Sequence, residues 1–463
     1  MNIVYIVVDT LRADHLSCYG YFRETSPNID RVAEDGVVFT NCFSEFPYTL
    51  PSFTSHITGI CGVGTGVVTN AWRKLNERHI VLDDKTPTLA EILFHSGYAT
   101  AAVDNMVNFG YHPKWFVRGY QYYINPRPRP PYTSDDALYD DIVRNTDMVL
   151  AEEVNYHVLK WLEAHGRDKD FFLFVHYWDP HTPYNLPRGF REKFCDEYYY
   201  EPPAVRLPDG DGFVPGWGRL SHLTDERREL VRLYDCEIYY VDHHIGALVD
   251  KLEEMGVYDE TLIVITSDHG EIMFEDHPGL LKERVEFGHG MLYNEVLHVP
   301  LIIKFPGQEF RGRRVDALVQ TVDIFPTVLR VAGVEGDFRT DGVDLLSLLE
   351  GEWEGRDAVI GTYVSSKFAA RSLMSGDWKL ITYTTSDVEL YDLARDPYET
   401  VNVAEEQGDV ARQMRDALEA RVREYVEKWG RPDPLTVPEL LDWQLGRETV
   451  WKVTPAGERP DKG

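Results

Sequence analysis

The sequence predicts an α/β protein in which a mostly parallel β-sheet lies sandwiched between helices, with a small α+β subdomain near the C-terminus. Short apolar runs alternate with helical patterns over most of the chain, as they do where crossover helices join parallel strands. Near Gly342 this pattern gives way to two β-like runs and a helical stretch. The predicted main domain therefore covers residues 1–343, and the smaller C-terminal subdomain, with its antiparallel hairpin, covers residues 344–463.

The strands of the main sheet are predicted from apolar runs bounded by turn residues. These runs cover residues 3–8, 99–103, 171–176, 262–266 and 299–305. A helix is predicted from Thr86 to Gly97, because Pro87 suits a first helical turn and Gly97 suits a helix end. A second helical pattern, over residues 225–255, is long enough to span the domain, and Gly256 ends it.

The C-terminal subdomain is predicted to hold a hairpin and one helix. Residues 378–383 and 389–393 are the β-like runs, and residues 410–429 follow with a helical pattern. Two irregular stretches, residues 125–132 and 202–218, are rich in Pro together with Arg or Gly. We expect both to be surface loops, and loops of this length often border binding sites.

The chain has 463 residues, with 77 acidic and 47 basic side chains and a formal net charge of −30. This charge excludes a nucleic-acid binder that works through basic patches, and it disfavours docking on an anionic membrane. No apolar stretch approaches the roughly 20 residues that a membrane span needs. A small anionic substrate would therefore need local attraction, from a metal ion or a cluster of hydrogen-bond donors. The sequence sets no limit on homo-oligomer formation.

The cysteines are odd in number, widely scattered and without C-x-x-C spacing: Cys18, Cys42, Cys61, Cys195 and Cys236. This pattern predicts free thiols in a reducing compartment rather than a disulfide framework. The opening residues 1–9 hold an apolar run, but no basic segment precedes it and no small-residue cleavage site follows. Together these features predict a cytoplasmic protein.

Polar side chains suited to a metal follow three predicted strands: Asp9 follows the first, His176, Asp179 and His181 follow another, and Asp268 with His269 follows a third. In an open parallel sheet, ligands bind beyond the carboxyl ends of the strands. A single Asp after a strand is more often a helix cap or a turn former. Three such ends together favour a cage of carboxylates and imidazoles that holds a divalent ion.

A fourth element is the short helix predicted after Thr49. Pro51 suits the first turn of this helix and Gly59 suits its end, so Thr49 lies about where an N-cap belongs. From spacing alone, capping is favoured over catalysis. The N-terminus of a helix would also stabilise an alkoxide and a bound anion, and a metal beside the hydroxyl would make it a nucleophile.

The chain resembles the sulfatase family of the alkaline phosphatase superfamily over nearly its whole length. The matching motifs stand in family order: residues 9–14 (DTLRAD), 51–52 (PS), 58–59 (TG), 179–184 (DPHTPY), 267–271 (SDHGE), 289–295 (HGMLYNE), 299–300 (VP), 322–327 (VDIFPT) and 389–393 (ELYDL). This number of ordered matches implies the sulfatase-like fold, a mostly parallel sheet between helices with a small C-terminal subdomain.

The resemblance also implies roles for single residues. A divalent metal would be held by Asp9, Thr49, Asp268 and His269. Thr49 occupies the nucleophile position. His181 matches a histidine that contacts the anionic group or the leaving oxygen of the substrate, and His289 falls where relatives place a lysine or histidine with a similar task. Arg12 and Asp14 match recurring residues that we interpret as structural supports.

Metal identity and number stay open at this stage. Manganese, zinc, calcium and magnesium all fit, although the imidazole of His269 disfavours a purely oxygen-liganded calcium site. A second ion would draw on His181, His289 and Asp179. For His176 and Asp179, orientation of His181 is favoured over direct ligation.

Four departures from the family pattern disfavour arylsulfatase chemistry. Sulfatases carry Cys or Ser at the position of Thr49 and oxidise it to formylglycine, whereas a secondary alcohol such as threonine would give a ketone. The arginine expected after Pro-Ser is Phe53, and the sulfate-gripping Gly-Lys-Trp-His segment reads Asp-Asn-Met-Val over residues 104–107. The second aspartate of the usual opening pair is Thr10.

A threonine nucleophile instead resembles the phosphodiesterase and phosphonate monoester hydrolase branches of the superfamily. The predicted function is metal-dependent hydrolysis of a phosphodiester, phosphonate ester or phosphomonoester through Thr49. One alternative is a sulfatase that does not use formylglycine, and a second is a catalytically silent, anion-binding homologue. Aromatic residues within 111–123 either line a pocket for the leaving group or pack beneath a loop.

Overall fold

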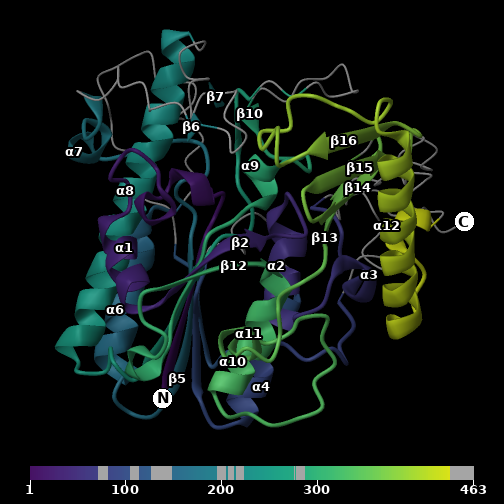
Figure 1. The fold of residues 1–463 in the computed structure, drawn as a ribbon. Coiled ribbons are helices and arrows are strands. Elements are labelled where there is room, and N and C mark those ends of the chain that lie inside the picture. The colour runs from purple at the N-terminus through teal and green to yellow at the C-terminus, as the bar shows by residue number, and fades with distance from the viewer. Residues whose placement is uncertain are drawn as a thin grey trace, which may run out of the picture.

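The structure is a computed structural model, and it describes residues 1–70, 82–104, 114–126, 149–195, 205–206, 213–214, 224–275, 277, 287–365 and 367–437. An eight-stranded sheet with the order β12-β2-β11-β8-β1-β5-β3-β4 forms its centre (Figure 1). Helices cover both faces of this sheet, and each face has its own apolar core. The predicted fold class is confirmed.

The strands of the main sheet are β12 (Arg313–Gln320), β2 (Val37–Phe43), β11 (Leu301–Lys304), β8 (Thr261–Thr266), β1 (Asn2–Val8), β5 (Phe171–Tyr177), β3 (Ala99–Val103) and β4 (Tyr122–Ile124). Strand β1 is wholly buried and pairs in parallel with β5 and β8. Strand β11 runs antiparallel to both of its neighbours, β2 and β8. An apolar run does not reveal strand direction, so the sequence predicted this strand but not its orientation.

Helices α1 (Pro27–Asp35), α6 (Ala151–His165) and α8 (Asp225–Glu254) pack on one face of the sheet, and α2 (Thr49–Thr58), α4 (Leu89–His95), α10 (Ile324–Val331) and α11 (Leu345–Leu349) pack on the other. The long helix predicted over 225–255 is confirmed as α8. Helix α4 begins later than predicted, because Thr88 and Glu91 form a capping box that fixes its start.

Shorter elements complete the main domain. They are α3 (Gly62–Thr65), α7 (Arg188–Arg191), α9 (Asn294–Leu297), the two-residue strands β6 (Val205–Arg206), β7 (Phe213–Val214), β9 (Ile272–Met273) and β10 (Phe287–Gly288), and single 3-10 turns at Ala13–His15, Ser17–Tyr19, Lys114–Val117, Pro306–Gln308 and Thr321–Asp323. Strands β9 and β10 pair antiparallel.

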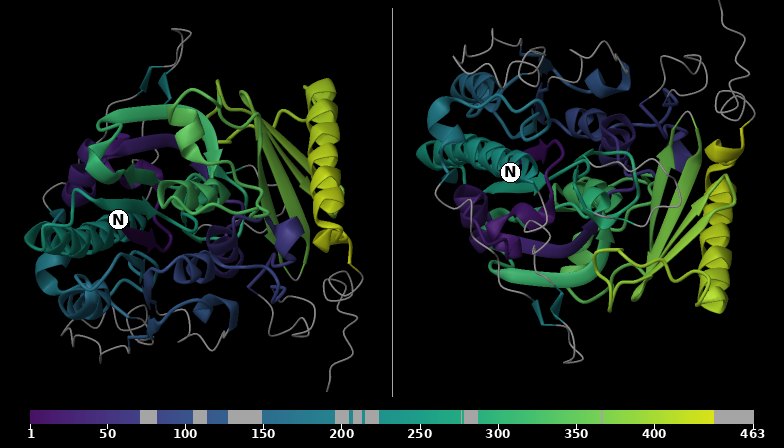
Figure 2. Two further views of the ribbon diagram at one scale, coloured as in Figure 1. Left: turned by 90° about the horizontal axis from the view of Figure 1, so that it is seen from below. Right: turned by 90° about the horizontal axis from the view of Figure 1, so that it is seen from above.

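The C-terminal region is a four-stranded antiparallel sheet covered by one helix. Its strands are β13 (Val359–Val364), β14 (Ala369–Ser375), β15 (Trp378–Tyr383) and β16 (Val388–Asp392), its helix is α12 (Gly408–Trp429), and a 3-10 turn follows at Pro434–Thr436. Figure 2 shows this sheet between α12 and the main domain. The predicted hairpin is confirmed as β15 and β16, and the structure adds two strands. The domain boundary near residue 343 stays a prediction.

Several sequence predictions fall on or near undescribed residues. Residues 127–132 of the first predicted loop and most of residues 202–218 lie outside the described residues. In the aromatic stretch, Tyr111 also lies outside them, whereas Trp115 and Phe116 are buried in the core, where the Trp115 indole donates a hydrogen bond to Thr54. For this part of the stretch, the structure supports packing rather than a pocket wall.

Two predictions from composition can be compared with the described residues. All five cysteines are free thiols, as predicted. The compartment inferred from them stays a prediction. Among the helices that the structure describes, none has the length and apolar character needed to cross a bilayer.

Candidate metal centre and active site

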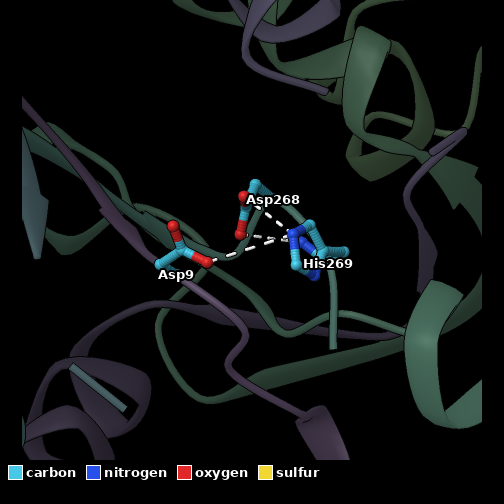
Figure 3. A group of neighbouring side chains, drawn as sticks. All are labelled: Asp9, Asp268 and His269. Carbon is cyan, nitrogen blue, oxygen red and sulfur yellow. Dashed lines mark hydrogen bonds and ion pairs between the residues drawn. The ribbon is translucent and has the colours of Figure 1, made fainter. Parts of the chain in front are cut away.

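The predicted metal ligands come from two neighbouring strands. Asp9 follows β1, and Asp268 and His269 follow β8; the two strands run parallel, with Val7 beside Thr266. Their carboxyl ends therefore meet at one edge of the sheet, although the residues are far apart in the chain. Figure 3 shows the three side chains pointing toward one another. Oδ1 of Asp268 accepts hydrogen bonds from the N–H groups of Thr10 and His269, at 3.2 and 2.9 Å.

The geometry of this group fits a divalent cation. One ligand atom from each of the three residues lies within 4.8 Å of the other two. The Nε2 atom of His269 is 3.4 Å from Oδ2 of Asp268 and 3.9 Å from Oδ1 of Asp9. His269 Nδ1 lies 2.9 Å from the carbonyl of Gly270, which assigns the proton to Nδ1 and leaves Nε2 as a lone-pair donor.

Three carboxylate oxygens of the group are buried without a hydrogen-bond donor among the residues that the structure describes. All three side chains are 0% exposed, and both oxygens of Asp9 and Oδ2 of Asp268 accept no hydrogen bond from the described residues. An unpaired, buried carboxylate is strongly destabilising. A cation at this place would satisfy these oxygens, and carboxylate oxygens with one imidazole nitrogen form a donor set for Mn²⁺, Zn²⁺ or Mg²⁺.

Protonation equilibria in the group follow from burial and charge. Burial, followed by repulsion from Asp268, raises the pKa of Asp9 to about 7, although His176 opposes this shift. Burial also raises the pKa of Asp268. Burial and the nearby His289 lower the pKa of His269 to about 3. His269 is therefore neutral near pH 7, which is the form that ligates a metal.

Thr49 is the first residue of α2, and Tyr48 is the N-cap. The Thr49 Oγ1 atom lies 3.4 Å from Nε2 of His269, so the hydroxyl faces the metal group and the capping interpretation is wrong. The first turn of α2 offers few free donors, because the Leu50 N–H binds Asn70 and Pro51 has none. The predicted contribution of this helix terminus to anion binding is correspondingly small.

His181 and His289 lie beside the metal group. The ring centroid of His289 is 4.5 Å from that of His269 and 5.2 Å from that of His181. Burial opposes the charging of His289, but Glu271, whose Oε1 lies 3.6 Å from Nδ1, leaves its pKa raised. Burial and His289 lower the pKa of His181 to about 4. The site thus holds one histidine that favours the protonated form and one that favours the neutral form.

Glu271 is a site residue with no role predicted from the sequence. It is buried, and burial raises its pKa, but the more numerous contributions of His289, His181 and His269 leave that pKa lowered. Its role could have been predicted from its place in the motif 267–271, two residues after the predicted ligand His269.

Two predicted supports of His181 lie elsewhere. His176 has Nε2 3.5 Å from Oδ2 of Asp9 and Nδ1 2.8 Å from Oδ1 of Asp104, so it contacts Asp9 rather than His181. Asp179 interacts with Glu237, and burial raises the pKa of both carboxyls, that of Asp179 to about 6. The orientation role predicted for these two residues is therefore wrong as regards His181.

The other predicted residues near the site have structural contacts. Arg12 is buried and donates to both oxygens of Asp14, to the carbonyl of Glu271 and to Glu275, as expected for a support. Phe53, at the position of the family arginine, is buried and packs edge-on against His176 with centroids 4.6 Å apart. In the described part of the chain, Asp9, Asp268 and His269 are the one group of three ligands at metal-binding distances.

Comparisons with known proteins identify relatives of this chain. The family model described as Sulfatase matches residues 1–334, and the model described as N-sulphoglucosamine sulphohydrolase, C-terminal, matches residues 283–427. The chain is 25% identical to the uncharacterized sulfatase YidJ of Escherichia coli (strain K12), over 97% of this chain and 92% of that protein.

Solved structures are similar over nearly the whole chain. The phosphonate monoester hydrolase of Agrobacterium radiobacter has a TM-score of 0.69 and 21% identity, covering 92% of this chain and 96% of that one. A structure solved with its substrate, D-glucosamine-2-N,6-O-disulfate, has a TM-score of 0.72 and 21% identity, covering 94% of this chain and 99% of that one. At these identities the likeness shows the fold alone.

Proposed function

We propose, from the premise that this chain belongs to the sulfatase family, that it is a metal-dependent hydrolase of small anionic esters and that it uses the Thr49 hydroxyl in place of formylglycine. The observation that carries the proposal is the position of this hydroxyl, 3.4 Å from Nε2 of His269 inside the buried group of Asp9, Asp268 and His269. A side chain that only capped α2 would face the backbone.

Different residues of the chain would bind the cation and present the nucleophile. Asp9, Asp268 and His269 would hold the divalent cation, with Thr49 beside them, and the cation would supply positive charge that acidifies a neighbouring hydroxyl and offsets the charge of the ester. Thr49 presents its hydroxyl to the reacting centre.

Proton transfer falls to the two histidines outside the metal group. His289, which Glu271 keeps biased toward the protonated form, is placed to donate a proton to the leaving oxygen. His181 has Nδ1 2.6 Å from the carbonyl of Thr182, which leaves a neutral Nε2 to accept a proton from the attacking group.

Sulfate esters are the substrate class that the relatives favour. The matched family model, the E. coli relative and the C-terminal family model all carry sulfatase or sulphohydrolase descriptions. A second candidate, phosphoryl ester hydrolysis, is favoured by the threonine at the position that the family resemblance assigns to the nucleophile. Attack of its hydroxyl on phosphorus would leave a phosphothreonine for water to cleave. The phosphonate monoester hydrolase among the structural neighbours shares this fold.

Matched substrates and two variants test the proposal. We would measure kcat/KM for p-nitrophenyl sulfate and for the p-nitrophenyl ester of phenylphosphonate, with Mn²⁺ and after chelation. Thr49→Ala should lower kcat/KM by roughly 10³-fold or more, while Thr49→Ser, which keeps a hydroxyl, should stay within about tenfold of wild type. Higher turnover of the sulfate ester supports the first class, and higher turnover of the phosphonate ester supports the second.

Two results would count against the proposal. Unchanged activity in Thr49→Ala would show that the hydroxyl is not the nucleophile. A wild-type chain that binds sulfate or phosphate but turns over neither ester would point to the catalytically silent, anion-binding homologue.

A further inference from the structure

A row of polar side chains crosses four neighbouring strands at the carboxyl edge of the main sheet. Asp9 follows β1, His176 lies in β5, Asp104 follows β3 and Tyr123 lies in β4. These strands are consecutive in the sheet, in the order β1-β5-β3-β4. Because all three pairings are parallel, the four side chains reach the same edge in the same order.

Contacts connect each member of the row to the next. His176 lies between two carboxylates, with Nδ1 2.8 Å from Oδ1 of Asp104 and Nε2 3.5 Å from Oδ2 of Asp9. The second oxygen of Asp104 accepts a hydrogen bond from the Tyr123 hydroxyl. Two members of the row are also fixed through the backbone, since Asp104 N–H donates to Ile124 O at 3.0 Å and Asp9 N–H donates to Tyr177 O at 2.9 Å.

The row is shielded from water. His176 and Asp9 are 0% exposed and Asp104 is 3% exposed. The ring of Phe53 packs edge-on against the His176 imidazole, with centroids 4.6 Å apart. Water therefore has little room to compete for the His176 nitrogens, and contacts between buried charged groups are stronger than the same contacts at the surface.

The two oxygens of the Asp9 carboxylate face different neighbours. Oδ2 faces His176, and Oδ1 is the oxygen that lies 3.9 Å from Nε2 of His269. If His176 were free to turn away, nothing among the described hydrogen bonds would hold the Asp9 carboxylate in this orientation, because neither of its oxygens accepts one.

We propose that His176, Asp104 and Tyr123 are positioning residues for the metal centre, which hold Asp9 with Oδ1 turned toward Asp268 and His269. The inference rests on the proposed function, because it requires that Asp9 bind a divalent cation. Partners behind a metal ligand generally change metal affinity by about 10- to 100-fold. The affinity of this chain for the cation would then depend on Asp104, which follows a strand two places away from that of Asp9.

The test is calorimetric titration of the full chain with Mn²⁺ alone, with no substrate present. Asp104→Asn removes the charge that holds His176, and we expect its Kd for Mn²⁺ to rise by about 10- to 100-fold. Tyr123→Phe removes one hydroxyl at the far end of the row and should raise the Kd about threefold.

A matched control separates positioning from general loss of packing. Tyr177→Phe removes a buried hydroxyl next to His176, whose hydrogen bond goes to Asn155 at 3.0 Å and not to the row. We expect this variant to lose stability without a change in the Kd for Mn²⁺. Circular dichroism and thermal unfolding of each metal-free variant identify any that does not fold.

The outcomes distinguish this inference from the proposed function. If wild type binds Mn²⁺, Asp9→Asn does not, and Asp104→Asn and Tyr123→Phe keep the wild-type Kd within twofold, the row does not position Asp9 and the inference is wrong. If Asp104→Asn does not fold, Tyr123→Phe decides by the same criterion. If wild type shows no Mn²⁺ binding that depends on Asp9, the metal centre and the inference fail together.

Discussion

Asp9 at the end of β1 and Glu389 in β16 are both buried carboxylates, with exposures of 0% and 1%. Glu389 accepts hydrogen bonds from the hydroxyls of three tyrosines, Tyr293 at 3.0 Å, Tyr391 at 2.8 Å and Tyr383 at 2.9 Å. Asp9 accepts none from the described residues and instead faces Asp268 and two histidines. The two carboxylates are thus equally buried, but hydrogen-bond donors surround only Glu389.

The difference indicates what each carboxylate is for. A buried charge surrounded by donors contributes to a stable fold, whereas removal of one of its partners is destabilising. A buried charge without donors weakens the fold until a cation or a proton binds it. Asp9 and Asp268 therefore have the character of a binding site, and Glu389 has the character of a core residue that joins the C-terminal sheet to Tyr293 of the main domain.

The largest expected effect concerns activity. Asp9→Asn should lower kcat/KM by roughly 10³-fold or more in Mn²⁺, because a metal ligand is lost. The free energy of unfolding of the metal-free variant should equal or exceed that of wild type, since burial and repulsion from Asp268 disfavour the ionised Asp9 by more than its contact with His176 favours it. Urea unfolding with and without chelator checks this. If the free energy of unfolding of metal-free Asp9→Asn were clearly lower than that of wild type, Asp9 would support the fold directly. The contrast between Asp9 and Glu389 would then be wrong.

The next largest effect concerns Glu389, the carboxylate that accepts hydrogen bonds from tyrosine hydroxyls. Glu389→Gln should lower the free energy of unfolding by about 3 kcal/mol, because the amide replaces an acceptor with a donor that meets tyrosine hydroxyls. Metal affinity should be unchanged, and calorimetry with Mn²⁺ provides that control. Stability within 1 kcal/mol of wild type would mean that the three hydrogen bonds contribute little net free energy.

A third prediction concerns pH. In the metal-free protein the pKa of Asp9 is raised to about 7 in the folded state, above its unfolded value near 4, so the folded state binds the proton more tightly. The contribution of Asp9 to stability is therefore fully present below pH 4 and is lost as the pH rises through 7. We expect a loss of roughly 4 kcal/mol from pH 4 to pH 8.

Saturating Mn²⁺ should remove the Asp9 part of this dependence, because the bound cation stabilises the ionised carboxylate. The measurement is the free energy of unfolding against pH for wild type and Asp9→Asn, each with chelator and with Mn²⁺. Identical pH profiles of the two metal-free proteins would contradict the raised pKa of Asp9.

The smallest expected effect is within the tyrosine cluster. Tyr391→Phe removes one of the three donors to Glu389 and leaves the other two, so it should lower the free energy of unfolding by about 1 kcal/mol. Tyr383→Phe is the matched variant on the other carboxylate oxygen and should behave alike. A loss as large as that of Glu389→Gln would show that the cluster acts as one unit rather than as separate hydrogen bonds.

Much of the fold and the metal group could be predicted from the sequence, because both depend on local patterns. The apolar runs that became β1, β3, β5 and β8 are readable as strands, and the residues that follow them fall at one edge of any parallel sheet. Asp9, Asp268 and His269 could therefore be brought together without coordinates, and the ordered motifs added the family.

The rest required the tertiary structure, because it depends on pairings between distant segments. The antiparallel direction of β11 and the two extra strands of the C-terminal sheet are set by neighbours that an apolar run does not specify. The same holds for side chains: spacing suggested that Thr49 caps its helix and that His176 supports His181. Strand order instead places His176 between Asp9 and Asp104, and the segment that follows β8 places His269 beside the Thr49 hydroxyl.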